Sequence, residues 1–226
     1  MQRVMRILTP AVLTAAPAAL IYCAVTGTGG TAALTIAMAI AALAVFLAKF
    51  ELKKPKPEEI LPVVVMAAIA AVGRMAFAPF PSFKPVTAIV MISAIAFGPE
   101  SGFLTGALAA LASNMFFGQG AWTPWQMYSW GMTGYAAGVL RNTRVMKSGA
   151  GAAAVGFVLA MGYGFIMDTW TLVGFVSPIN WATALAVYGA GLPLNLIHGA
   201  STVIFLGVLY IPWRRKLDRI KRKYGL

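Results

Sequence analysis

Long apolar stretches without a charged side chain divide this sequence into blocks. Residues 7–48, 101–140 and 148–167 contain no Asp, Glu, Lys or Arg. A bilayer core of roughly 30 Å is crossed by about 20 helical residues, because a helix satisfies its backbone amides internally. The pattern therefore predicts an all-α polytopic membrane protein.

Glycine and proline clusters set the limits of the predicted helices. The apolar pattern is interrupted at 27–30, 79–85 and 118–120, where these residues recur. Eight transmembrane helices result, at approximately 7–26, 31–49, 60–78, 86–99, 102–118, 124–140, 149–170 and 192–212. Another short helix is expected at 182–190, lying at the membrane surface before the final span.

A segment rich in charge and proline divides the chain into two membrane parts. We predict an N-terminal transmembrane hairpin at 1–50, a cytoplasmic linker at 51–59, a six-helix bundle at 60–213 and a basic cytoplasmic tail at 214–226. The hairpin consists largely of Ala, Leu, Val and Ile, so we expect it to serve packing or assembly. The bundle is the part expected to bind a small molecule.

The composition argues against a cytosolic enzyme. Hydrophobic residues make up 60% of the chain and charged residues 11%, with a mean hydropathy of +0.79, whereas soluble domains are roughly 45–50% apolar. The net charge is +12, but the basic residues lie in short clusters between apolar runs. We therefore expect no nucleic-acid partner and interpret the clusters as signals of membrane topology.

The basic clusters also predict an orientation in the cell membrane. With a cytoplasmic N-terminus and eight spans, 16 of the 18 Lys and Arg residues fall on the cytoplasmic side. Only Arg74 and Lys84 fall on the outer side. The positive-inside rule therefore places both termini of this multi-pass protein in the cytoplasm.

Polar and aromatic side chains gather at the outer ends of the predicted helices. Polar groups are costly at membrane depth, so they are candidates for a binding site. The segment 118–126 alone combines two indoles and two amides. The candidate substrate-binding residues are Arg74, Asn114, Gln119, Trp122, Trp125, Gln126, Trp130, Tyr163, Asp168, Asn195 and His198. An outward-facing cup lined by them would suit one planar, polar organic molecule.

Structural roles are the alternatives for several residues at this outer end. Tryptophans such as Trp170 and Trp181 commonly anchor helices at the membrane interface. Arg74 could extend to lipid phosphates or form an ion pair with Asp168. His198 could be a hydrogen-bonding group between two helices.

The motifs of ATP hydrolysis and of common hydrolases are missing. The sequence has no G-x-x-x-x-G-K-[ST] loop, no HExxH and no GxSxG, and it has one histidine and one cysteine. We therefore predict a binding subunit with no catalytic role, no cofactor and no metal site, whose energy comes from partners.

Two other classes stay open. An integral-membrane enzyme acting on a lipid or isoprenoid would need Asp168 and Glu100 to come together. A structural membrane subunit would need no pocket, and Trp122, Trp125 and Gln126 would then point into lipid.

Three stretches of the predicted bundle read VGRMAFAPFPSFKPVTAIV, GFLTGALAALASNMFFGQGAWTPWQMYSWGMTGYAAGVL and GLPLNLIHGASTVIFLGVLYIPW. They resemble the substrate-binding S component of energy-coupling factor (ECF) vitamin transporters, and the resemblance covers about residues 60–215. It implies a six-helix S-component fold that topples in the membrane, with a transmembrane coupling protein and two cytoplasmic ATPases as partners. It also implies that Ala67 and Ala71 face the coupling protein. The N-terminal hairpin is a departure from the six-helix pattern.

The predicted pocket also bears on the substrate. Several indoles and amides with few charges favour a flat, largely neutral heterocycle, such as a flavin, a pterin or a corrinoid, over a dicarboxylate or a phosphate ester. The resemblance favours cobalamin or a related corrinoid as the vitamin taken up.

Overall fold

The computed structural model describes residues 31–52 and 57–225, which form seven α-helices and one short 3-10 helix. The predicted span at 7–26 lies outside the described residues. The elements are α2 (Thr31–Leu52), α3 (Pro57–Ala76), α4 (Val86–Phe97), α5 (Pro99–Phe117), α6 (Trp122–Leu140), η1 (Val145–Lys147), α7 (Gly149–Phe175) and α8 (Trp181–Tyr224). No strand occurs in this part of the chain, so the all-α expectation is confirmed.

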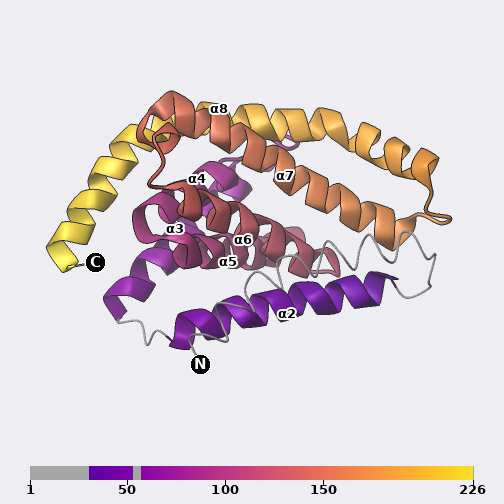
Figure 1. Ribbon diagram of the computed structural model, residues 1–226, viewed down its shortest axis with the longest axis horizontal. Helices are drawn as coiled ribbons and strands as arrows, with labels where there is room; N and C mark the ends of the chain where they lie inside the picture. The colour runs from indigo at the N-terminus through magenta and orange to yellow at the C-terminus, as the bar shows by residue number, and fades with distance from the viewer. Residues whose placement is uncertain (1–30, 53–56, 226) are drawn as a thin grey trace.

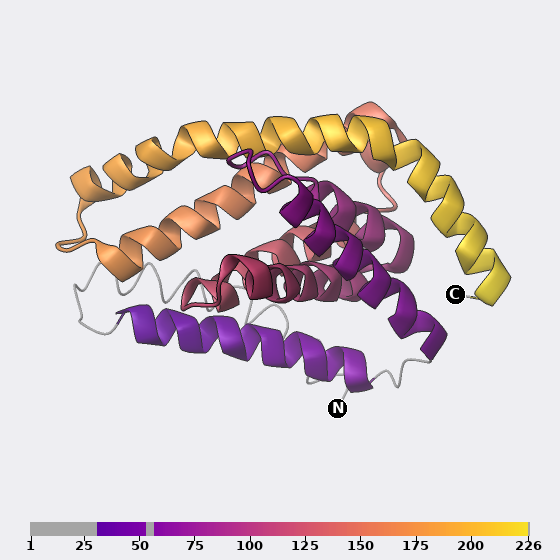
Figure 2. The same cartoon turned by 180° about the vertical axis from the view of Figure 1, so that it is seen from behind.

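The helices run between two ends of the bundle that differ in chemistry (Figure 1). One end carries the start of α3, the α6–α7 connection and the last part of α8. We call it the basic end, because Arg141, Arg144, Lys147 and seven further Lys and Arg residues at 214–223 lie there. The opposite end, with the α5–α6 and α7–α8 connections, is the aromatic end, and Figure 2 shows both from behind.

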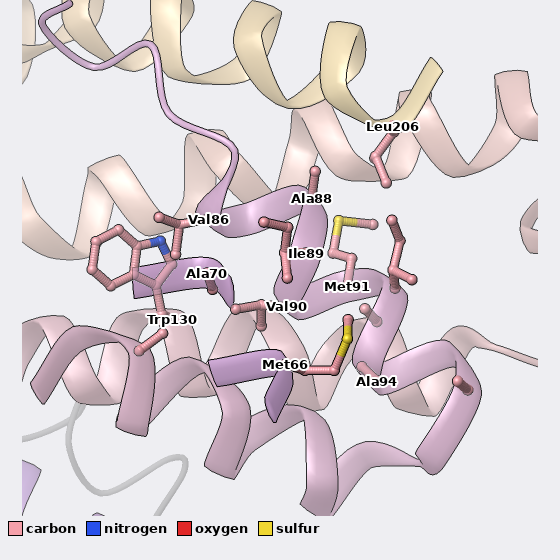
Figure 3. Packing of buried hydrophobic residues seen from close by; sticks show 14 of the residues in the cluster. Met66, Ala70, Val86, Ala88, Ile89, Val90, Met91, Ala94, Trp130 and Leu206 are labelled. Atoms are coloured by element: carbon pink, nitrogen blue, oxygen red, sulfur yellow. The ribbon is translucent and has the colours of Figure 1, made fainter. Parts of the chain in front are cut away.

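Three of the described helices, α3, α7 and α8, are long and apolar enough to cross a membrane by length and composition alone. α4 is also apolar but has only 12 residues, which corresponds to about 18 Å. It is nevertheless the centre of the fold, because residues 86–94 are all buried. Figure 3 shows its side chains packed between Met66 of α3, Trp130 of α6 and Leu206 of α8.

Glycines allow α5 and α6 to pack with their backbones in contact. A Cβ added at Gly102 would lie 2.7 Å from the carbonyl oxygen of Gly134, and one added at Gly106 would lie 2.3 Å from that of Trp130. Small residues four apart create such contacts between membrane helices. The spacing that the sequence shows at Gly102, Gly106, Gly134 and Gly138 therefore serves packing within the chain.

α2, the described helix of the predicted N-terminal hairpin, packs on the bundle. α2 lies mainly against α5, α6 and α7, and Leu43 joins an apolar cluster with Val63, Phe103 and Leu104. α2 therefore leaves most of the outward face of α3 uncovered.

The expectation of a separate surface helix at 182–190 is wrong, because α8 is continuous from Trp181 to Tyr224. A capping box formed by Asn180 and Thr183 starts the helix. Pro193 lies inside it, where a proline removes one backbone donor without ending a membrane helix. The predicted basic tail is helical as well, and Leu217 packs it onto the core.

Ala67 and Ala71 lie inside the bundle instead of on a surface that a partner could reach. Their exposed fractions are 3% and 4%, because α3 packs on α4 and α5 through this side. In this arrangement the two alanines therefore do not face a partner protein, contrary to what the resemblance had implied. The exposed side of α3 carries Leu61, Val65 and Val72.

Candidate functional site

Most candidate residues lie where helix ends meet at or near the aromatic end. Arg74 is in the last turn of α3, Asn114 in the last turn of α5 and Gln126 in the first turns of α6. Tyr163 comes from α7 and His198 from α8. These candidate residues therefore come from five helices.

Arg74 is the centre of a polar network. Its Nη1 donates hydrogen bonds to Ser113 Oγ and Asn114 Oδ1, each at 2.6 Å. Its guanidinium carbon lies 4.6 Å from the ring centroid of Phe117 and 5.0 Å from that of Trp130. The side chain is therefore held toward α5 and α6, and the alternative of an Arg74–Asp168 ion pair is not what the structure shows.

Amides and a hydroxyl extend this network into the α5–α6 connection. Asn114 Nδ2 donates to Thr123 Oγ1 at 3.0 Å and to Gln126 Oε1 at 2.8 Å. Thr123 in turn donates to Gln119 Oε1 at 2.9 Å. Gly118 has a φ of +96°, a backbone conformation that favours glycine, and it turns the chain between the two helices.

An aromatic column continues from Arg74 into α7 and α8. Trp130 stacks on Tyr163 with ring centroids 4.6 Å apart, and Tyr163 lies 5.1 Å from the ring of His198. The Tyr163 hydroxyl also contacts the side chain of Gln126. These rings touch one another, so a ligand would lie beside the column and not between its members.

A directed chain of hydrogen bonds fixes this column. Trp130 Nε1 donates to Thr87 Oγ1 at 3.2 Å, and Thr87 Oγ1 lies 2.8 Å from His198 Nε2. His198 Nδ1 lies 3.2 Å from the carbonyl oxygen of Ser82. Because a carbonyl can only accept, Nδ1 carries the proton and Nε2 accepts from Thr87. His198 therefore has the interhelical role that was its alternative.

Two other candidate groups lie apart from this network. Asn195 Nδ2 donates to Asp168 Oδ2 at 2.7 Å, which links α7 to α8. Gly164 and Gly191 leave room for this pair, since a Cβ at either would lie within 2.3 Å of it. Glu100, in the first turn of α5, is at the basic end, so it does not come together with Asp168 as a membrane enzyme would require.

The tryptophans differ in their surroundings. Trp125 is 3% exposed and packs on Trp170, with ring centroids 5.8 Å apart. Its indole Nε1 is buried without a hydrogen-bond partner among the described residues. Trp122 is 40% exposed and Trp181 is 86% exposed. Trp125 therefore faces inward, whereas Trp181 suits an anchor at the membrane interface.

Lys84 organises the connection between α3 and α4. Its ammonium group contacts the carbonyl oxygens of Phe77, Ala78 and Phe80. Partial burial lowers the pKa of Lys84, and the positive charge of Arg74 lowers it further. Its backbone N–H and carbonyl both bond to Ser201 Oγ of α8, so this connection is fixed to the bundle.

Three buried hydroxyl groups that complete the site, those of Thr87, Ser113 and Thr123, are not among the residues predicted from the sequence. Serine and threonine in apolar helices carry little signal, because their hydroxyls can bond to the backbone of their own helix. For Ser113 alone the sequence holds a signal, because it is the neighbour of Asn114.

The helices that build this site lie within a region that matches a known protein family. Residues 59–210, well over half of the chain, match the family model described as "ECF transporter, substrate-specific component". No curated protein and no solved structure shows significant similarity to the chain. The match covers α3 to the apolar part of α8, which are the helices that build the Arg74 network and the aromatic column. The chain belongs to the family of substrate-specific components of ECF transporters.

Proposed function

We propose that this chain is the high-affinity, membrane-embedded substrate-binding subunit of an ECF-type ABC importer. The ligand would be a vitamin or related heterocyclic micronutrient, with cobalamin or another corrinoid as the first candidate. Family membership supports the importer role and a partnership with ECF membrane and ATPase modules. The single observation that carries the site is the hydrogen-bonded network from Arg74 through Asn114 to Gln126, which joins three helices.

The network suits reversible binding. Its members are neutral amides, hydroxyls and one guanidinium, held in place by one another and by aromatic rings. Such preorganised polar groups fix the orientation of a ligand without reacting with it. Among the described residues no three His, Cys, Asp or Glu side chains are placed to hold a metal ion.

The experiment that tests this proposal is a titration of the purified protein with a panel of vitamins that includes cyanocobalamin. We expect saturable binding of one member. Asn114→Ala removes one of the two acceptors of Arg74 and the amide that donates to Gln126 Oε1. It should therefore weaken binding at least about tenfold, because each unmade hydrogen bond in a dry site costs roughly 1–3 kcal/mol. Asn142→Ala, an exposed asparagine at the basic end, is the matched control and should bind as wild type.

The outcomes separate the alternatives. No saturable binding to any vitamin would refute the uptake proposal. Unchanged affinity in both Asn114→Ala and Trp125→Ala would show that the ligand binds elsewhere.

We also propose that α3 contacts the coupling protein. Its outward side, formed by Leu61, Val64, Val65, Ala68 and Val72, is apolar and exposed. Direct docking at Ala67 and Ala71 would require α4 or α5 to move away, because both alanines are covered.

Copurification with the coupling protein distinguishes the two faces of α3. Ala68→Leu should reduce copurification without lowering the melting temperature if the outward side docks. Ala67→Leu and Ala71→Leu should lower the melting temperature as well, because they overpack a buried contact. Full copurification of all three variants would refute a contact through α3.

A further inference from the structure

The charges at the aromatic end do not balance. Arg74 and Lys84 lie there, and Arg74 acts on Lys84 electrostatically. All six acidic side chains of the chain belong to the described residues. Asp168 is the one acid on this side, and it is bound by Asn195. The other five, at the basic end, are Glu51, Glu58, Glu59, Glu100 and Asp218.

The positive charge of Arg74 has no negatively charged partner among the described residues. Within residues 31–52 and 57–225, its hydrogen-bond acceptors are Ser113 and Asn114, which are both neutral and both bond to Nη1. Nε and Nη2 have no acceptor in that part of the chain. A guanidinium at membrane depth without a counter-charge is costly, and such residues pair with an opposite charge or mark a substrate site.

Lys84 adds a second positive charge near Arg74. Its ammonium is already held by three backbone carbonyls, so it has little capacity for another ligand. Two cations beside each other raise the local concentration of anions at this end of the bundle.

We infer that the molecule taken up carries an anionic group, a carboxylate or a phosphate, which binds to the free Nε–Nη2 edge of Arg74. This inference rests on the proposed function and specifies its substrate class. It replaces the largely neutral heterocycle expected from the sequence with a molecule that carries an anionic group. A guanidinium edge matches two oxygens of a carboxylate or phosphate with two parallel hydrogen bonds. A corrinoid meets the requirement through the phosphodiester of its nucleotide loop, whereas an uncharged flavin does not.

A lipid phosphate is the other source of the same chemistry. The geometry favours a soluble ligand, because the guanidinium lies against Phe117 and Trp130 and bonds to two side chains that are fully buried, Ser113 and Asn114. An arginine that reaches for headgroups would instead extend outward along the helix.

The test compares ligands that differ by one charge. The protein, in nanodiscs of zwitterionic phosphatidylcholine, is titrated with cyanocobalamin and riboflavin and with two matched pairs, nicotinate with nicotinamide and biotin with biotinamide. We expect the tightest ligand to carry an anionic group, and a bound acid to bind about tenfold or more tightly than its amide, as a charge-assisted bond implies. Arg74→Gln should remove that preference and weaken the anion about 10- to 100-fold, while Arg74→Lys keeps part of it.

Controls keep this result interpretable. Lys147→Gln removes an exposed cation at the basic end and should leave affinity unchanged. The acid–amide preference of the wild-type protein needs no variant, so it decides the question even if Arg74→Gln fails to fold. Repeating the titration in phosphatidylglycerol nanodiscs tests the lipid source.

Three results would overturn the inference. A tightest ligand that has no anionic group, and whose affinity Arg74→Gln leaves unchanged, would overturn the anionic substrate and leave the uptake proposal standing. Stabilisation by phosphatidylglycerol that depends on Arg74, without any acid–amide preference, would assign the arginine to lipid. No saturable binding by any compound would overturn both proposals together.

Discussion

The contact between α5 and α6 makes Gly106 the most informative position for a stability test. In Gly106→Ala the new Cβ would lie 2.3 Å from the carbonyl oxygen of Trp130 and 2.4 Å from its carbonyl carbon. Ordinary contacts begin about 1 Å further away, and the atoms it meets are backbone, which cannot rotate aside. The two helices must therefore separate at this level.

The expected cost follows from that clash. Overpacking by one methyl group in a well-packed interior costs about 1–3 kcal/mol, which corresponds to roughly 2–12 °C in melting temperature for a chain of this size. Trp130 also carries the indole that contacts Arg74. Its displacement should therefore weaken ligand binding as well.

The assay is thermal unfolding of the purified protein in detergent, with Gly162→Ala as the control. Gly162 lies in α7 with no atom within 4 Å of the added Cβ, and alanine is the better helix former by about 0.5–1 kcal/mol. Gly162→Ala should therefore melt at the wild-type temperature or slightly above. A Gly106→Ala protein as stable as this control would refute the close packing of α5 on α6.

Three further predictions concern the polar chain, the tail and the orientation. Thr87→Val removes the acceptor of the Trp130 N–H and the partner of His198, which should lower the free energy of unfolding by about 1–3 kcal/mol and so lower the melting temperature. Thr171→Val, at an exposed position, should leave it unchanged, and equal melting temperatures for the two variants would contradict the hydrogen-bond chain from Trp130 to His198. Leu217→Glu should detach the basic tail from the core and speed tryptic cleavage of the tail roughly 30-fold, if packing of Leu217 contributes about 2 kcal/mol. Asp218→Asn should be cleaved at the wild-type rate, and equally slow cleavage of both variants would show that Leu217 does not hold the tail on the core. A C-terminal green fluorescent protein fusion should fluoresce in bacteria and the matching alkaline phosphatase fusion should be inactive, because the positive-inside rule places this end in the cytoplasm. An active phosphatase fusion would show that the predicted topology is inverted.

The sequence predicted the helices well where apolar blocks end at glycine or proline. α6 and α7 begin within a few residues of the expected positions. The prediction for 182–190 failed because the backbone groups that a proline frees in a membrane helix can be satisfied by their surroundings, so that Pro193 does not mark a helix end.

The sequence also predicted which end of the bundle holds the polar groups, but not their partners. Arg74, Asn114 and Gln126 do come together. The pairing of Asp168 with Asn195 depends on the rotation of α7 and α8 about their axes, which one sequence does not specify. The same limit applies to Ala67: its small size indicates a close contact but not which neighbour fills it.

The shortness of α4 has a consequence for the shape of the aromatic end. A helix of about 18 Å crosses little more than half of a hydrocarbon layer of roughly 30 Å. The connection at 77–85 therefore stops well short of the α7–α8 tip, as Figure 2 shows. α7 and α8 continue past this connection, so their ends, and not α4, form the outermost part of the aromatic end.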